Sequence, residues 1–275
     1  DAISGTITLN DYSAALNGSS ADVAAALAGS FAANYTGNVT LSDTPTNAQL
    51  ELIDAATTGN ITYNGSNDYT VSDSTISAGQ LNSLDGEYSG TVDASAVTTI
   101  TGTATDLITA YTSSGISGLG NEAINVSSGS ASTSQANTLA ASTSGPVTAT
   151  ISDGDMATLA GLTETGNAYT ITITDNSVAE SALNNLAAKT NVAINAANIN
   201  TLTGSAADLN TAYTSSGISG LGNEAVTLSD TTLAASVLNT LDGNTSGTIN
   251  ASAVTTITGT ATDLITAYTS SGISG

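Results

Sequence analysis

The stretch ASAVTTITGTATDLITAYTSSGISG occupies residues 94–118 and returns letter for letter at residues 251–275. A diverged copy, INTLTGSAADLNTAYTSSGISGLGNEA, lies between them at residues 199–225. Repetition of this kind is typical of architectures in which each unit is one small element that stacks only on its neighbours. The repeat therefore predicts a solenoid.

Short runs of alternating apolar and hydroxyl residues mark each predicted coil. TITIT at residues 170–174 shows the period of two that is typical of a half-buried strand. Successive runs begin 20 to 35 residues apart, and one short and one long coil together give a 55-residue super-repeat, clearest at 73–128 and 175–230. The runs end in the marker residues Asp11, Asp43, Asp73, Asp93, Asp153, Asp175, Asn195, Asp230 and Asn250, with Ser128 in the same place.

After each marker the apolar spacing changes to that of a helix. In the short coil, leucines 233, 238 and 241 lie on one helical face. The long coil carries two such pieces, which Gly102 separates, and we expect Thr103 to cap the second one.

These patterns predict an α/β solenoid. We expect a parallel sheet with one or two short helices in each coil of 20–35 residues, continued through residues 1–275 as a single elongated repeat domain. A β-helix is the alternative, because Thr, Ser and Gly are poor helix formers and the helical pieces could instead be irregular arcs.

The charge composition limits the partners. Asp and Glu number 23, whereas one Lys and no His leave a formal net charge of −22. We expect no nucleic-acid partner, because neutralising phosphates requires clustered Lys or Arg. No apolar run is long enough to cross a bilayer, so we also expect no membrane insertion.

The residue types present argue against an enzyme. Without His or Cys, the usual nucleophile and transition-metal arrangements cannot form, and carboxylates are the remaining catalytic candidates. The marker carboxylates recur where a strand gives way to a helix, and Asn195 and Asn250 replace them without being acids. This pattern predicts helix caps, so we expect no catalytic residue and no organic cofactor.

Calcium is the one ion that the sequence leaves open. LDGEYSG at 84–90 and LDGNTSG at 241–247 place oxygen-bearing side chains in tight turns, the ligands that Ca²⁺ prefers. An ordinary turn is the simpler explanation of both stretches, since neither an EF-hand loop nor a glycine-rich calcium nonapeptide is present. The candidate ligands are Asp85, Glu87, Asp242 and Asn244.

Threonine rows suggest a second kind of function. On the predicted strands, the outward positions include Thr6 and Thr8, Thr148 and Thr150, and Thr170, Thr172 and Thr174. A regular face of hydroxyl and methyl groups could bind ice or a surface polysaccharide. Threonine is also simply a strong strand former on a solvated face.

The combination VTLSDTTLAASVLNTLDGNTSGTINASAVTTITGTATDLITAYTSSGISGLGNEA, assembled from residues 226–275 and 119–123, resembles the long tandem-repeat proteins of marine picocyanobacteria. The resemblance is good over about 72–128 and 175–275 and loose elsewhere. It implies a secreted or cell-surface location, and it transfers no functional residue.

The leading functional prediction is structural. The segment from Gly118 to the next marker position, Ser128, is nearly as long as the one that would lead from Gly275 through the start of another copy to Asp11. One copy could therefore continue the next nearly in register. We expect an extracellular filament or surface fibre built by head-to-tail stacking of solenoid ends, with an adhesive role.

Overall fold

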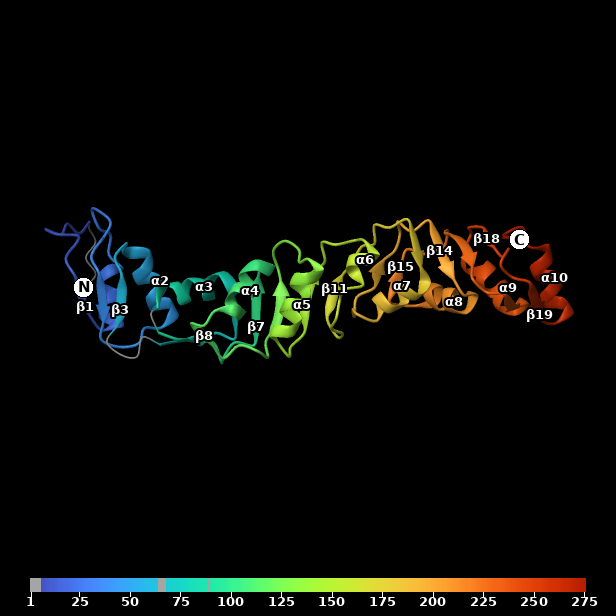
Figure 1. Ribbon diagram of the computed structural model, residues 1–275. Coiled ribbons are helices and arrows are strands. Elements are labelled where there is room, and N and C mark those ends of the chain that lie inside the picture. The colour runs from blue at the N-terminus through green and yellow to red at the C-terminus, as the bar shows by residue number, and fades with distance from the viewer. Residues whose placement is uncertain (1–5, 64–67, 89) are drawn as a thin grey trace. The chain divides into compact units, whose positions relative to one another are not determined.

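The computed structural model describes residues 6–63, 68–88 and 90–275. Parallel strands alternate with helices along the described chain, as Figure 1 shows, so the predicted α/β solenoid is confirmed. The chain divides into two compact units. The first comprises Asp1–Gly102 and Asp106–Glu122, and the second comprises Thr103–Thr105 and Ala123–Gly275.

The first unit stacks its strands in three parallel groups. β1 pairs with β2 and β2 with β3, β4 pairs with β6 and β6 with β8, and β5 pairs with β7. The elements up to residue 122 are β1 (Leu16–Gly18), α1 (Ser20–Leu27), β2 (Val39–Leu41), α2 (Asn47–Ala56), β3 (Ile61–Tyr63), β4 (Tyr69–Thr70), β5 (Thr75–Ser77), α3 (Ala78–Glu87), β6 (Val92–Asp93), β7 (Thr99–Gly102), α4 (Ala104–Thr112) and β8 (Ile116–Ser117).

The second unit repeats the arrangement. Its longest ladder is parallel throughout and runs in the order β12, β14, β16, β18, β20. Three shorter ladders are also parallel. In the first, β10 pairs with both β9 and β11; in the second, β13 pairs with β15; in the third, β17 pairs with β19. The elements are β9 (Ala123–Val126), α5 (Thr133–Ser142), β10 (Val147–Thr150), α6 (Met156–Leu159), β11 (Ala168–Thr170), β12 (Ser177–Ala179), α7 (Glu180–Ala187), β13 (Ile194–Asn195), β14 (Thr201–Gly204), α8 (Ala206–Thr214), β15 (Ile218–Ser219), β16 (Ala225–Leu228), β17 (Thr232–Ala234), α9 (Ala235–Asn244), β18 (Ile249–Asn250), β19 (Thr256–Thr258), α10 (Ala261–Thr269) and β20 (Ile273–Ser274).

The coil length differs from the prediction. Strand pairing joins Thr148 to Ala168 and Ile249 to Ile273, so each coil is close to the predicted short coil in length, and the expected long coil is wrong. The interval from Asn195 to Asp230 holds β14, α8, β15 and β16, which is more than one full coil. The markers alternate in spacing because they occupy different places in successive coils.

The expectation of two helices in the long coil is also wrong. The piece before Gly102 is strand β7, which pairs with β5, and only the piece after it is helical. Its β-branched Thr and Ile side chains favour a strand over a helix. Two strands of one coil pair with different neighbours, so the single predicted sheet is replaced by several.

Helix starts compensate for the poor helix-forming composition. Ser205 and Thr260, at positions equivalent to Thr103, accept hydrogen bonds of 3.2 Å from the N–H groups of Asp208 and Asp263. The helices α2, α3 and α5 begin with complete capping boxes, each a Thr or Ser paired with a Gln three residues later. These caps and the packing of each apolar face favour helices over the irregular arcs of a β-helix.

Small aliphatic side chains and a few tyrosines fill the core. Ile53 and Leu81 in the first unit, and Leu139 and Leu209 in the second, are 0 % exposed. Tyr69 and Tyr169 are each 1 % exposed. The tyrosines thus place titratable hydroxyl groups inside the solenoid.

These buried tyrosines predict alkaline unfolding. Burial raises the pKa of Tyr69 and Tyr169 to about 12, and it also raises the pKa of Tyr88 and Tyr213. Because the unfolded-state pKa is about 10, this contribution to stability is complete below that pH and is lost as pH rises from about 10 towards 12. We expect tyrosinate absorbance to rise in two stages, the second together with loss of the circular dichroism signal. A single stage shared by all tyrosines, with the fold intact, would contradict this.

Candidate functional site

Four marker carboxylates cap helices, but not the helices expected. Each accepts a hydrogen bond from the first helical N–H of the preceding coil, whereas the sequence predicted a cap on the helix that follows. The bonds run from Ser20 to Asp43 (2.6 Å), Thr133 to Asp153 (2.6 Å), Met156 to Asp175 (2.5 Å) and Ala206 to Asp230 (2.8 Å). Since a helix start leaves several N–H groups free, a local cap and this second cap serve it together. These side chains therefore join coil to coil.

Of the remaining described markers, four make turns. Each accepts from the N–H two residues later, in a turn that leads to another segment and not to a helix. The pairs are Asp11 with Ser13, Asp93 with Ser95, Asn195 with Ala197 and Asn250 with Ser252. The capping role predicted for these four residues is therefore wrong. Asp73 lies apart from both groups and lines the acidic groove described below.

Each of the four calcium candidates makes a separate contact. Asp85 and Asp242 accept hydrogen bonds from the hydroxyls of Ser113 (2.6 Å) and Ser270 (2.7 Å), which belong to the next coil. Asn244 donates to Asn210, and Glu87 lines the acidic groove. In residues 6–63, 68–88 and 90–275, no group of three or more Asp, Glu, His or Cys side chains is placed to hold a metal ion. The expected tight turns are wrong, because Asp85 and Glu87 lie at the end of helix α3, and Asp242 and Asn244 at the end of helix α9. Calcium binding by these residues stays a prediction.

Two buried glutamates were not predicted from the sequence. Glu122 and Glu224 are 0 % and 1 % exposed. Glu224 accepts from the Tyr213 hydroxyl (3.1 Å) and the Gly222 N–H (2.8 Å), and Glu122 makes the same contacts with Tyr111 and Gly120 (both 2.8 Å). In sequence, the GLGNEA stretch indicates only a glycine turn. The signal that both copies share is a Tyr at the same separation before the Glu.

The threonine rows are exposed but interrupted. Thr150 pairs with Thr170, whereas Thr148 lies opposite Asn125 and Ala168. The next pairing joins Thr172 to Asn195. The described part of the second unit therefore breaks these rows with other residues, and recognition of ice or polysaccharide stays a prediction. Thr6, Thr8 and Thr174 are also exposed.

An apolar face is uncovered at α10. Ile265 is 64 % exposed and Tyr268 is 77 % exposed. Beside them, Val254, Ile257, Ala267 and Ile273 line a hollow of about 220 Å³. No helix follows α10 within residues 1–275, so these side chains have no cover from a following coil there.

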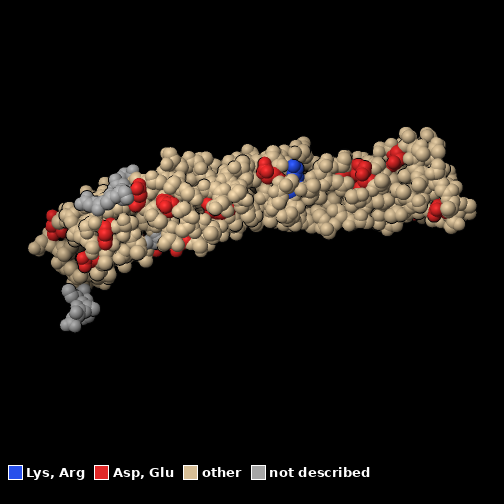
Figure 2. All heavy atoms as spheres, turned by 90° about the horizontal axis from the view of Figure 1, so that it is seen from below, with Lys and Arg blue, Asp and Glu red and all other residues tan. Residues whose placement is uncertain are grey.

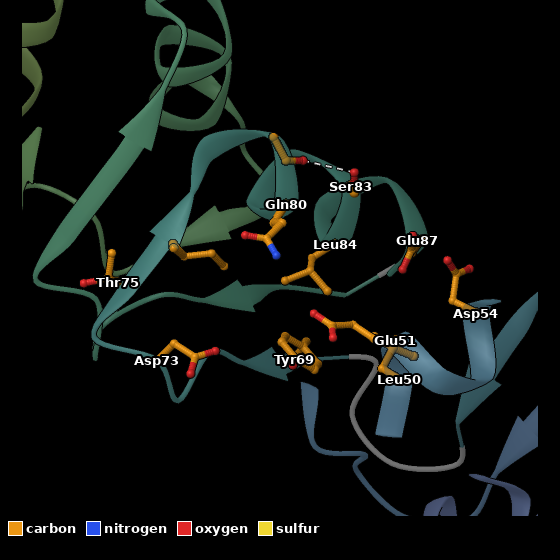
Figure 3. A pocket seen from close by; sticks show the side chains of 12 residues that line it. Leu50, Glu51, Asp54, Tyr69, Asp73, Thr75, Gln80, Ser83, Leu84 and Glu87 are labelled. Carbon is orange, nitrogen blue, oxygen red and sulfur yellow. Dashed lines mark hydrogen bonds between the residues drawn. The ribbon is translucent and has the colours of Figure 1, made fainter. Parts of the chain in front are cut away.

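An acidic groove lies in the first unit between α2 and α3, with strands β4 and β5 beneath (Figure 3). Its volume is about 500 Å³, within the range of small-molecule sites. Leu50, Tyr69 and Ile76 are buried and form an apolar floor. The carboxylates Glu51, Asp54, Asp73 and Glu87 lie at the exposed rim.

The groove is strongly negative. Partial burial, and then the charge of Asp54, raise the pKa of Glu87 above its usual value. The chain's single basic side chain is Lys189, whose Nζ donates to the Thr163 carbonyl in the second unit. On the face in Figure 2, most of the surface is uncharged and the acidic side chains stand in small groups. The rim of the groove is thus a local concentration of negative charge on a sparsely charged protein.

Among the described residues, none of the helices combines the length and apolar character that a membrane span needs. No protein-family model, curated protein or solved structure matches this chain.

Proposed function

We propose that this protein is a structural repeat protein of the cell exterior, which forms a filament or surface fibre when the α10 end of one copy accepts a coil of another. A solenoid buries the apolar faces of its coils by stacking each coil on its neighbours. The observation that carries the proposal is the difference between α8 and α10, two helices of nearly the same sequence.

Helix α8 supports the proposal because it illustrates a covered coil. Its Leu209 and Ala212 are buried, and Tyr213 donates to Glu224 of the following coil. Asn210 donates to the Val237 carbonyl of α9, which packs on α8. The following coil therefore covers the α8 residues that correspond to the exposed residues of α10.

Helix α10 carries the same repeat, and within residues 1–275 no further helix follows it to cover these residues. Ile265 and Tyr268 stand where α8 has Asn210 and Tyr213, and both are exposed. Covering an apolar side chain of this size yields about 1.5–3 kcal/mol. A coil of the same kind, from a continuing repeat or from a second copy, has the shape that α8 already accepts. We propose that copies supply this coil to one another.

A charge substitution on α10 tests the stacking. We expect the purified chain to form longer particles as its concentration increases, measured by sedimentation velocity and electron microscopy. Ile265→Asp together with Tyr268→Asp should keep it monomeric, because burying the new carboxylates would be costly. Assembly should also increase with salt, since copies that each carry −22 repel one another and ions screen that repulsion.

Thr262→Asp is the matched control. Thr262 is exposed on α10, and its equivalent on α8, Ala207, remains exposed although α8 is covered. This variant should assemble like the parent chain. Monomers at every concentration and salt level, with a native circular dichroism spectrum, would refute self-stacking.

The extracellular setting requires its own test. One Lys and no Arg leave a single cleavage site for trypsin-like proteases, which suits an exposed protein. Antibody labelling of intact cells should detect the protein at the surface. Labelling that requires permeabilised cells would contradict this location.

A further inference from the structure

The acidic groove of the first unit has the features of a binding site that stacking does not require. We propose that it binds an aliphatic polyamine, with the methylene chain on the apolar floor and the ammonium groups at the carboxylate rim. The proposal concerns residues far in sequence from α10 and does not depend on filament formation.

The arrangement of the carboxylates favours an extended cation over a metal ion. Figure 3 shows Asp54 and Glu87 near one another at one end of the groove, and Asp73 at the other end. Glu51 lies between these two ends in the same view. Within the described residues the acids do not converge as a metal-holding group. Ammonium groups separated by methylene groups match both the separated charges and the floor between them.

Tyr69 provides an independent observation. Its side chain lines the groove and is 1 % exposed, and its hydroxyl has no hydrogen-bond partner among the described residues. Figure 3 shows it between Asp73 and Glu51, and the charges of both carboxylates add to the effect of burial on its pKa. A buried hydroxyl without a partner is costly, and an ammonium group would give it a donor. The hydroxyl is covered in the free protein, so an ammonium group in the groove would reach it only where the side chains around it move aside.

The direct test is titration calorimetry of the purified full chain with spermidine and putrescine at constant ionic strength. Butylamine, which has one ammonium group, and CaCl₂ are the comparison ligands. We expect saturable binding of the polyamines, at least about tenfold tighter than that of butylamine, since a charge-assisted hydrogen bond is worth about this ratio. Equal affinity for butylamine, or binding of Ca²⁺ without binding of polyamine, would overturn the proposal.

Matched variants distinguish polyamine binding in the groove from non-specific electrostatic attraction of polyamines to an acidic protein. Glu51→Gln should weaken spermidine binding about tenfold, whereas Glu164→Gln, an equal loss of charge at an exposed position of the second unit, should leave it unchanged. Equal effects of the two substitutions would reduce the binding to non-specific charge attraction and refute the site.

Tyr69→Phe gives a readout that a structural role would not produce. It should weaken polyamine binding while leaving the melting temperature of the free protein unchanged or higher, because a partnerless hydroxyl is removed. Tyr63→Phe is its control: that hydroxyl also lacks a partner among the described residues, but Tyr63 does not line this groove. It should leave polyamine binding unchanged. If the folded Tyr69→Phe variant binds polyamine as tightly as the parent chain, the hydroxyl takes no part in binding and the proposal is contradicted.

Discussion

Replacement of Gly220 by Ala should destabilise the second unit far more than the same replacement of Gly166. Both glycines have a φ of +86°, which L side chains adopt at a cost of about 1–2 kcal/mol. A Cβ on Gly220 would lie 2.8 Å from the Ala197 nitrogen of the preceding coil, whereas nothing lies within 4 Å of a Cβ on Gly166. Only Gly220→Ala therefore adds a clash between coils, worth about a further 1–3 kcal/mol.

Urea unfolding of the two variants measures this difference. Gly166→Ala gives the backbone cost alone, so subtracting it isolates the contact between coils. We expect Gly220→Ala to lower the free energy of unfolding by about 2–5 kcal/mol, the sum of the two costs. Equal effects would mean that the two backbones do not approach closely at Ala197, and that the stacking of these coils is described wrongly.

Glu224→Ala is the other substitution that we expect to lower the free energy of unfolding strongly. The carboxylate is 1 % exposed and accepts from the Tyr213 hydroxyl, from the Gly222 N–H and, at 3.2 Å, from the Asn223 N–H. Truncation leaves these donors without their acceptor at about 1–3 kcal/mol each. We expect the free energy of unfolding to fall by about 3–5 kcal/mol, measured by chemical denaturation.

Milder substitutions show how much each contact of Glu224 contributes to the free energy of unfolding. Tyr213→Phe removes the hydroxyl that bonds Glu224 and Thr245 but leaves the backbone donors satisfied, so it should cost about 1–2 kcal/mol. Combining it with Glu224→Gln in a double-mutant cycle measures the coupling of the two side chains. Glu164→Ala, at an exposed site, should change stability by less than about 0.5 kcal/mol. A loss for Glu224→Ala as small as that of Glu164→Ala would show that the buried carboxylate does not hold the loop.

The markers show how far local reasoning extends. Asp43 and Asp230 are expected to cap helices because a side-chain oxygen at a strand end suits a free N–H. Their donors, Ser20 and Ala206, lie one coil earlier in the chain. Local spacing cannot reveal such a donor, since it comes into reach only when two coils stack.

The groove and the glutamates were missed for a related reason. Glu51 and Asp73 are far apart in the chain and approach the same hollow only through the packing of α2 and β4. Glu224 gave no sign of burial, because a charged residue in a glycine-rich turn is usually solvated. The recurrence of a Tyr at a fixed separation before it was visible, but its meaning depended on a contact between helix and loop.

By itself the sequence determined the class of fold. Repetition, and the alternation of the strand period of two with the helix period of about 3.6, depend on residues close together in the chain, so both can be read from the sequence. It also predicts, through charge alone, that nucleic acid is not a partner. Only the tertiary structure decided the true length of the coil, the helix to which each Asp belongs and the place of the acidic groove. These features are set by which residues of successive coils come to lie side by side, and that register is fixed by packing between residues distant in the chain.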